Sequence, residues 1–232
     1  MPDTLATRKV LGVLVPVFNS VVEPELADLR PPGVTNQTAR FVMDADVLEN
    51  VHAAGTSLMT CGAEALLIGL STESIPGGLS VLEKGAARLA DDTGLPVLTA
   101  SHATRGALQA LGARRLAIVT PFDDAANAHV GASFEEAGFE VTNLVGLACP
   151  SLDQIGHIPA DAIRQAFRDA QHAEADTLVQ VGTGLPTVGL VEALESEHEK
   201  PVVATNAALY WQALRTVGVL DALPSAGRLG QI

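Results

Sequence analysis

Hydroxyl residues and glycines occur together at two points of the sequence, each directly after an apolar run. Ser71 and Thr72 follow one run, and Thr183 follows another between Gly182 and Gly184. Glycine lets a ligand approach backbone N–H groups closely. Neutral donors of this kind suit the oxygens of a carboxylate or of an enolate. These residue types therefore predict a binding site for a small carboxylate.

Two asparagines and a proline lie at comparable points of the sequence. Asn19 follows an apolar run that contains Pro16, and Asn206 ends the run Lys200–Asn206. The alternative is that such Ser, Thr and Asn side chains only cap the next helix, as they often do. Because donors of one kind gather after several apolar runs, we favour a binding site and include Asn19, Pro16 and Asn206 in it.

Three residues are candidates for acid–base or nucleophilic chemistry. Glu73 would be a general base if a dry pocket raised its pKa, although a solvated carboxylate at a helix start is the competing interpretation. His102 begins a helix-like stretch, where it would either move protons or face water. Cys149 follows the predicted strand Val141–Leu147 and is the third candidate. We expect Cys61 to be a buried structural thiol.

Several enzyme classes leave no trace in this sequence. It has no G-x-S-x-G elbow, no P-loop, no G-x-G-x-x-G and no H-E-x-x-H motif. Its two cysteines are too far apart for a metal motif or a disulfide framework, and its six histidines show no ligand spacing. We therefore expect neither a metal nor a cofactor.

Charge and hydropathy narrow the choice of partner. The net charge is −13, and no Lys/Arg cluster offers a nucleic-acid footprint. No apolar run approaches the roughly 18–20 residues that span a bilayer, and the N-terminus does not resemble a signal peptide. We expect a cytoplasmic protein that binds a small anionic substrate, with neither nucleic acid nor membrane as a partner.

The elements that would position the donors form a long-period repeat. Pro16 and Pro121 are 105 positions apart, and so are Pro96 and Pro201. The first pair lies in similar strand-like runs, and the second pair opens two others. The alternative, chance similarity between Val-rich strands, is disfavoured by the equal spacing at both ends of the unit. The matched runs are Leu11–Val17 with Leu116–Phe122, Ala65–Thr72 with Thr177–Gly184, and Leu95–Ser101 with Lys200–Asn206.

Helix-like stretches alternate with these strands. Apolar residues recur at helical spacing over Ala45–Met59, Leu79–Leu89 and Ala160–Ala173. Such alternation predicts an α/β fold with two pseudo-symmetric lobes, each a four-stranded parallel sheet flanked by helices. We expect the first lobe over 1–113 and the second over 114–206, with a C-terminal helix at 207–232 that returns to the first. Ligands bind such sheets beyond the carboxyl ends of the strands.

The order of these features resembles a known family. Val15-Pro16, Asn19 and then Glu23-Pro24-Glu25 resemble the opening of maleate cis-trans isomerases, in the aspartate/glutamate racemase superfamily that also includes arylmalonate decarboxylase. The run Pro201–Asn206 leading to Trp211 resembles the last strand and helix of that family. The resemblance spans nearly the whole chain.

The resemblance implies two facing cysteine thiols, one from each lobe, of which arylmalonate decarboxylase keeps only the second. The first thiol position falls on Leu70 in this sequence, and the second falls on Gly182. Phe122 stands where the family has a tyrosine, while Asn19 and Asn206 match its substrate-binding asparagines. The donors are therefore retained and the thiols are replaced.

The resemblance implies a divergent, cofactor-independent enzyme that acts on a small carboxylate or dicarboxylate through an enolate-like state. A different acid or base would then replace the thiols. One alternative is a non-catalytic binding protein that has kept the donors. Another is an ordinary maleate isomerase that uses Cys149. The family also implies a homo-oligomer.

Overall fold

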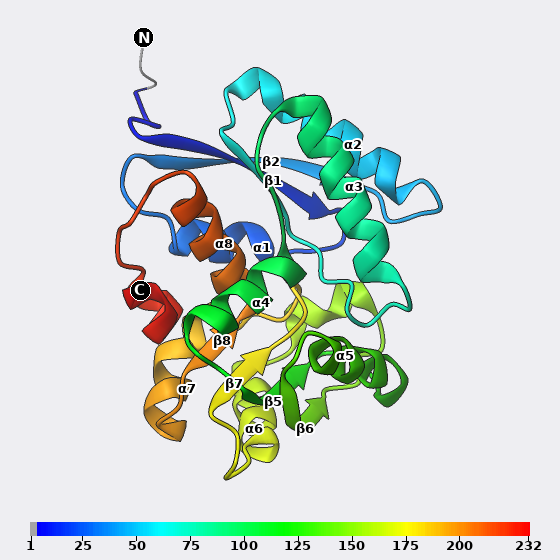
Figure 1. Cartoon of the computed structure of the whole chain (residues 1–232), viewed down its shortest axis with the longest axis vertical. Helices are drawn as coiled ribbons and strands as arrows, with labels where there is room; N and C mark the ends of the chain where they lie inside the picture. The colour runs from blue at the N-terminus through cyan, green and yellow to red at the C-terminus, as the bar shows by residue number, and fades with distance from the viewer. Residues whose placement is uncertain (1–3) are drawn as a thin grey trace.

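Two separate four-stranded parallel sheets organise the chain in the computed structural model, which describes residues 4–232 (Figure 1). The strand order is β2-β1-β3-β4 in the first sheet and β6-β5-β7-β8 in the second. The strands of the first sheet are β1 Lys9–Pro16, β2 Val34–Phe41, β3 Ala65–Ile68 and β4 Val97–Thr99. Those of the second are β5 Arg115–Thr120, β6 Glu140–Gly146, β7 Thr177–Gln180 and β8 Val202–Ala204.

Helices connect successive strands and cover both sheets. The α-helices are α1 Val22–Asp28, α2 Val47–Ser57, α3 Gly78–Thr93, α4 Ala100–Ala110, α5 Asp124–Glu136, α6 Ala160–Ala170, α7 Val191–His198 and α8 Thr205–Thr216. Short 3₁₀ helices are η1 Leu58–Cys61, η2 Leu152–His157, η3 Val188–Leu190 and η4 Pro224–Gln231. None of the described helices is long and apolar enough to cross a membrane.

The predicted two-lobed α/β fold is confirmed. The repeat corresponds to the topology, because β1 and β5 are the equivalent inner strands of their sheets and pair with equivalent neighbours. Glycines follow the C-terminal ends of α3 and α5, where Gly94 and Gly138 have φ of 69° and 90°. Glycine adopts such positive φ values without the steric cost that a Cβ atom adds.

The alternation of side chains along each strand divides the core into three clusters. From β1, Val13 and Val15 join a central cluster with α1 and α8, whereas Leu14 packs with α2 and α3. From β5, Val119 joins the same central cluster, and Ile118 packs against α4 and α5. Successive residues of a strand face opposite sides of its sheet, so both faces of each sheet are buried. The central cluster joins the two lobes.

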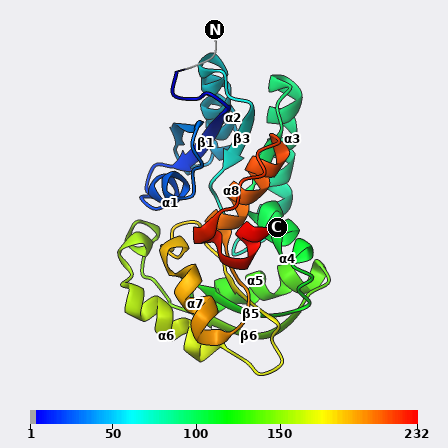
Figure 2. The same cartoon turned by 90° about the vertical axis from the view of Figure 1, so that its left-hand side faces the viewer.

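The C-terminal elements pack at the junction of the lobes. Helix α8 lies against α4 and α1, and Figures 1 and 2 show α8 beside α4 between the two sheets. The last segment, η4, turns to α7 and β8 of the second lobe. The chain after residue 206 therefore contacts both lobes.

Two local features differ from the sequence-based expectation. Strand β2 has no clear signal in the sequence, because Val34–Phe41 is an edge strand whose middle residues are polar and partly exposed. The expectation of a buried Cys61 is wrong. This residue ends η1 at the surface, where its Sγ donates to the backbone O of Leu58 at 2.9 Å.

Candidate functional site

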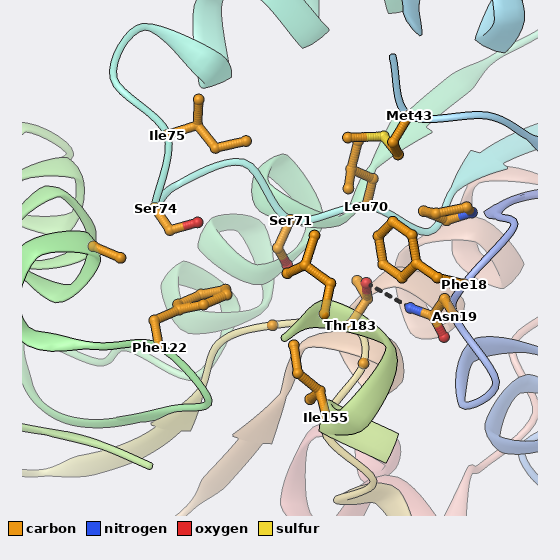
Figure 3. A pocket seen from close by; sticks show the side chains of 15 residues that line it. Phe18, Asn19, Met43, Leu70, Ser71, Ser74, Ile75, Phe122, Ile155 and Thr183 are labelled. Carbon is orange, nitrogen blue, oxygen red and sulfur yellow. Dashed lines mark hydrogen bonds between the residues drawn. The ribbon is translucent and has the colours of Figure 1, made fainter. Parts of the chain in front are cut away.

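A cavity of about 270 Å³ lies where the carboxyl ends of strands from both sheets meet. The loops after β1, β3, β5 and β7 form most of its wall, and η2, the loop after β2 and the start of α5 complete it. Figure 3 shows the side chains that converge on it. It is lined by Pro16, Phe18, Asn19, Met43, Leu70, Ser71, Ser74, Ile75, Phe122, Ala126, Leu152, Ile155, Gly182, Thr183 and Gly184.

Eight of the ten residues predicted to bind substrate line this cavity: Pro16, Asn19, Leu70, Ser71, Phe122, Gly182, Thr183 and Gly184. Their convergence follows from the topology, because parallel strands bring their carboxyl ends to one edge of a sheet. The two residues outside the lining are Thr72 and Asn206, both buried. Sequence reasoning missed Met43 because it follows the unassigned strand β2. It missed Leu152 and Ile155 because η2 has no periodic pattern.

Asn19 connects the two lobes at the wall of the cavity. Its Oδ1 accepts hydrogen bonds from the backbone N–H groups of Val21 and Val22 at the start of α1. Its Nδ2 donates to Thr183 Oγ1 at 3.2 Å, the contact drawn in Figure 3. The Thr183 hydroxyl in turn donates to the backbone O of Gly69 at 3.1 Å. These contacts set the amide orientation, so that Asn19 presents its N–H donors to the second lobe.

Ser71 offers a hydroxyl that no other described group uses. Its Oγ is buried and has no hydrogen-bond partner among residues 4–232. In Figure 3 it points toward the side of the cavity on which Phe122 and Thr183 lie. A buried hydroxyl without a partner is costly unless a ligand or water satisfies it. Ser71 is therefore placed to donate to an anionic ligand.

Among residues 4–232, no charged side chain lines the cavity. A positively charged side chain, Arg40, contacts the loop that carries Asn19 without lining the cavity. It donates through Nη1 to the backbone oxygens of Pro16, Val17 and Asn19, and through Nη2 to Glu23 at 2.6 Å. A bound anion must therefore be held by neutral donors. Arg40 instead fixes the loop that carries Asn19.

At two positions of the cavity wall, Phe122 and Gly182, the second lobe offers no side-chain hydrogen-bond donor. Phe122 has no hydroxyl, and its backbone is held by Thr120 and Asn127, whose side chains bond each other at 2.5 Å. Gly182 has φ 116°, and a Cβ built on it would lie 2.9 Å from Cδ of Pro121. Only glycine fits this backbone without strain.

The three candidate acid–base residues do not come together in the cavity. Glu73 is 2% exposed, lies outside the lining, and has a pKa raised by burial, an increase that its own backbone N–H, the Ser101 hydroxyl and the Arg105 guanidinium oppose. His102 lies exposed on the first turn of α4 beside a surface hollow. Cys149 is half-buried, and its Sγ donates to Ser151 O at 3.5 Å. None of the three lines the cavity with the donors, and the sequence does not reveal the side-chain directions that decide this.

The described residues contain no group of three or more His, Cys, Asp or Glu side chains that could hold a metal ion. The side chains that line the cavity offer hydroxyl and amide groups on an otherwise apolar wall.

Comparison with known proteins decides the family. The family model for arylmalonate decarboxylase matches residues 11–230. The chain belongs to the arylmalonate decarboxylase family. It is 29% identical to a maleate isomerase of Nocardia farcinica, with 94% of each chain covered, and 26% identical to the arylmalonate decarboxylase of Bordetella bronchiseptica, with 97% of each covered.

Solved structures agree with this assignment. A cysteine-to-serine mutant of the Nocardia farcinica maleate cis-trans isomerase, solved with a covalently bound succinylcysteine intermediate, superposes with a TM-score of 0.85. It is 26% identical, and the match covers 96% of this chain and 98% of that one. The resemblance expected from the sequence is confirmed. Relatives of this chain are isomerases and decarboxylases.

The buried carboxyl group of Glu25 should make the free energy of unfolding depend on pH. Burial raises its pKa from 4.5 to about 7, although hydrogen bonds from Asn206, Val188 and Thr187 oppose the increase. Between these two pH values the unfolded chain releases this proton while the folded chain keeps it. The free energy of unfolding should therefore fall by about 3 kcal/mol as pH rises from 4.5 to 7.

Urea unfolding of the wild type and of Glu25→Gln across this pH range checks the expectation. Other groups titrate as well, among them Glu73, whose pKa is also raised by burial. The informative quantity is therefore the difference between the two proteins at each pH. A difference that does not change with pH would contradict the raised pKa of Glu25.

Proposed function

We propose that this chain is a cofactor-independent enzyme acting on a small carboxylate or dicarboxylate, through an enolate-like state held by hydroxyl and amide donors. The observation that supports this most strongly is the unpartnered Ser71 hydroxyl, which lines the same cavity as the Asn19–Thr183 pair, with no charged side chain among the described lining residues. Preorganised donors in an apolar site stabilise developing negative charge on oxygen more strongly than water does.

The residues at the thiol positions favour one reaction within the family. Isomerisation through a cysteine adduct adds a thiolate to a carbon–carbon double bond. Leu70 and Gly182 stand at the expected thiol positions, and no cysteine lines the cavity. The addition therefore lacks its nucleophile in this chain.

Decarboxylation of a malonate needs no nucleophile. The bond between the α-carbon and one carboxylate breaks, CO₂ leaves, and the electron pair moves onto the remaining carboxylate as an enediolate. The α-carbon then takes a proton, which water supplies in the absence of a thiol. Neutral donors such as Ser71 would hold the enediolate oxygens.

The apolar part of the wall suits the departing carboxylate. Leu70, Ile75 and Ile155 line the cavity with Met43 and Leu152. A carboxylate held against such side chains loses hydration without gaining a charged partner, so its conversion to neutral CO₂ is favoured. We therefore place substituted malonates ahead of maleate as substrates.

A second candidate function is non-catalytic binding of a small carboxylate. The replacement of both thiols, together with a phenylalanine at position 122, favours it. Such a protein would keep the affinity for the acid and lack the turnover. The experiment must therefore measure binding and turnover in the same samples.

Incubation with methylmalonate, phenylmalonate and maleate in heavy water, followed by NMR, tests the proposal. We expect CO₂ release from a malonate, with deuterium at the α-carbon of the product, and no isomerisation of maleate. The same acids should raise the melting temperature of the protein, because a ligand that binds the native state stabilises it.

Ser71→Ala provides the check on the site. Removal of one oxyanion donor typically lowers kcat by about 10²–10³-fold, so we expect a loss of this order. Ser133→Ala is the matched control, because Ser133 is also buried but bonds within α5, away from the cavity. Stabilisation without turnover would favour the binding protein. If no acid of the panel stabilised the protein and none was turned over, both functions would be refuted.

A further inference from the structure

Two buried polar residues outside the cavity connect its Thr183 wall to the first lobe. Glu25 belongs to α1, and Asn206 is in the first turn of α8. They are 8% and 1% exposed, and neither lines the cavity. The family resemblance predicts that Asn206 binds substrate, but its amide nitrogen bonds to other protein groups.

Both oxygens of the Glu25 carboxylate are occupied. Oε1 accepts from the backbone N–H groups of Thr187 and Val188 at 2.6 and 2.7 Å. Oε2 accepts from Asn206 Nδ2 at 2.7 Å. Asp28, on the same helix, is the charged group that acts on this carboxyl. A carboxyl of the first lobe thus holds two backbone donors of the segment that follows the Thr183 loop.

The amide of Asn206 has one orientation that satisfies its neighbours. Its Nδ2 donates to Glu25 and also to the backbone O of Thr183 at 3.0 Å. Its Oδ1 has no partner among the described residues. In the flipped orientation an amide oxygen would face two acceptors, which is unfavourable. The carboxylate of Glu25 therefore determines that Asn206 donates to Thr183.

Thr183 is consequently held at both its backbone and its side chain. Asn206 fixes the backbone oxygen, while Asn19 and Gly69 fix Oγ1. We infer that Glu25 is a positioning residue that acts through Asn206, keeping the Gly182–Gly184 loop in place to meet a ligand. The identity of the ligand in this inference rests on the proposed function. The contacts of Glu25 and Asn206 are within the protein and do not depend on any ligand.

A double variant separates this positioning role from a merely structural one. In Asn206→Asp alone, two carboxylates face each other, and stability should fall. In Glu25→Gln with Asn206→Asp, the glutamine oxygen still accepts from Thr187 and Val188, and its nitrogen donates to the new carboxylate. The link between the lobes is then restored, but Thr183 O has no donor because a carboxylate carries no N–H.

Residue-resolved amide exchange by NMR is the readout, because it needs no ligand. Leu185 N–H donates to Gly182 O and reports on the loop, while Val188 N–H reports on the carboxylate contact. We expect the double variant to recover stability relative to Asn206→Asp and to keep Val188 protected. Leu185 should exchange at least about tenfold faster than in the wild type.

Asn206→Ala is a second variant in case the double one does not fold. It removes the donor to Thr183 and leaves Glu25 bonded to Thr187 and Val188, so Leu185 should again exchange faster. Unchanged Leu185 exchange in a folded variant of either kind would overturn the inference.

Phenylmalonate is the binding probe, and its affinity should fall at least tenfold in a variant with fast Leu185 exchange. Wild-type affinity in such a variant would also overturn the positioning role. If phenylmalonate does not bind the wild type, the proposed substrate class fails, while the exchange result still decides the role of Glu25.

Discussion

Gly182→Ala should lower the free energy of unfolding by about 2–6 kcal/mol, because backbone strain and a steric overlap act together at this position. An L-residue at a φ of 116° is strained by about 1–3 kcal/mol. The new Cβ would also lie 2.9 Å from Cδ and 3.0 Å from Cγ of Pro121. Overpacking of this kind typically costs a further 1–3 kcal/mol. Urea unfolding measures the sum.

Gly189→Ala is the matched control, because it has no positive φ and no atom within 4 Å of its Cβ. It should change stability by less than about 0.5 kcal/mol. If Gly182→Ala were as stable as this control, the loop after β7 would have a different backbone from the one described.

The loss of stability expected at Gly182 also affects attempts to introduce a cysteine at this position. Gly182→Cys should be destabilised as strongly as Gly182→Ala, because the strain comes from the Cβ atom. Leu70 has no positive φ, so Leu70→Cys should be accommodated with only the loss of buried apolar area. Of the two positions where the family resemblance implies thiols, Leu70 in the first lobe is therefore the one at which this backbone can accept a cysteine without rearrangement.

Asn19→Asp should keep the contacts at the start of α1 and reduce carboxylate affinity at least about 100-fold, and it should lower stability because a buried charge replaces the amide donor to Thr183. The aspartate keeps an oxygen for the N–H groups of Val21 and Val22, and Asp and Asn cap helices equally well. Its charge, however, enters a wall that contains no cation. Two like charges about 4–5 Å apart repel by roughly 3–4 kcal/mol at an effective dielectric constant near 20.

Titration calorimetry with the acid that most stabilises the wild type measures this effect. Gln109→Glu makes the same charge change on the exposed side of α4 and should alter the affinity less than about twofold. Equal affinity of Asn19→Asp and the wild type would place the ligand away from Asn19, and so away from the cavity between the lobes.

Much of this site was predictable from the sequence because of the topology of parallel sheets. Strand-like runs at matched spacing indicated the duplication, and the carboxyl ends of parallel strands must meet at one edge. The residues after β1, β3, β5 and β7 were therefore identified without coordinates, among them Asn19, Ser71 and Thr183.

The sequence by itself thus determined the duplicated α/β fold, the family and the loops that face each other. The tertiary structure decided which side chains in those loops reach the cavity. Ser71 lines it, whereas Thr72 and Glu73 do not, because loop dihedrals rather than a regular period set their directions. It also decided that Asn206 serves Glu25 and Thr183, since a partner 181 positions away along the chain leaves no local pattern.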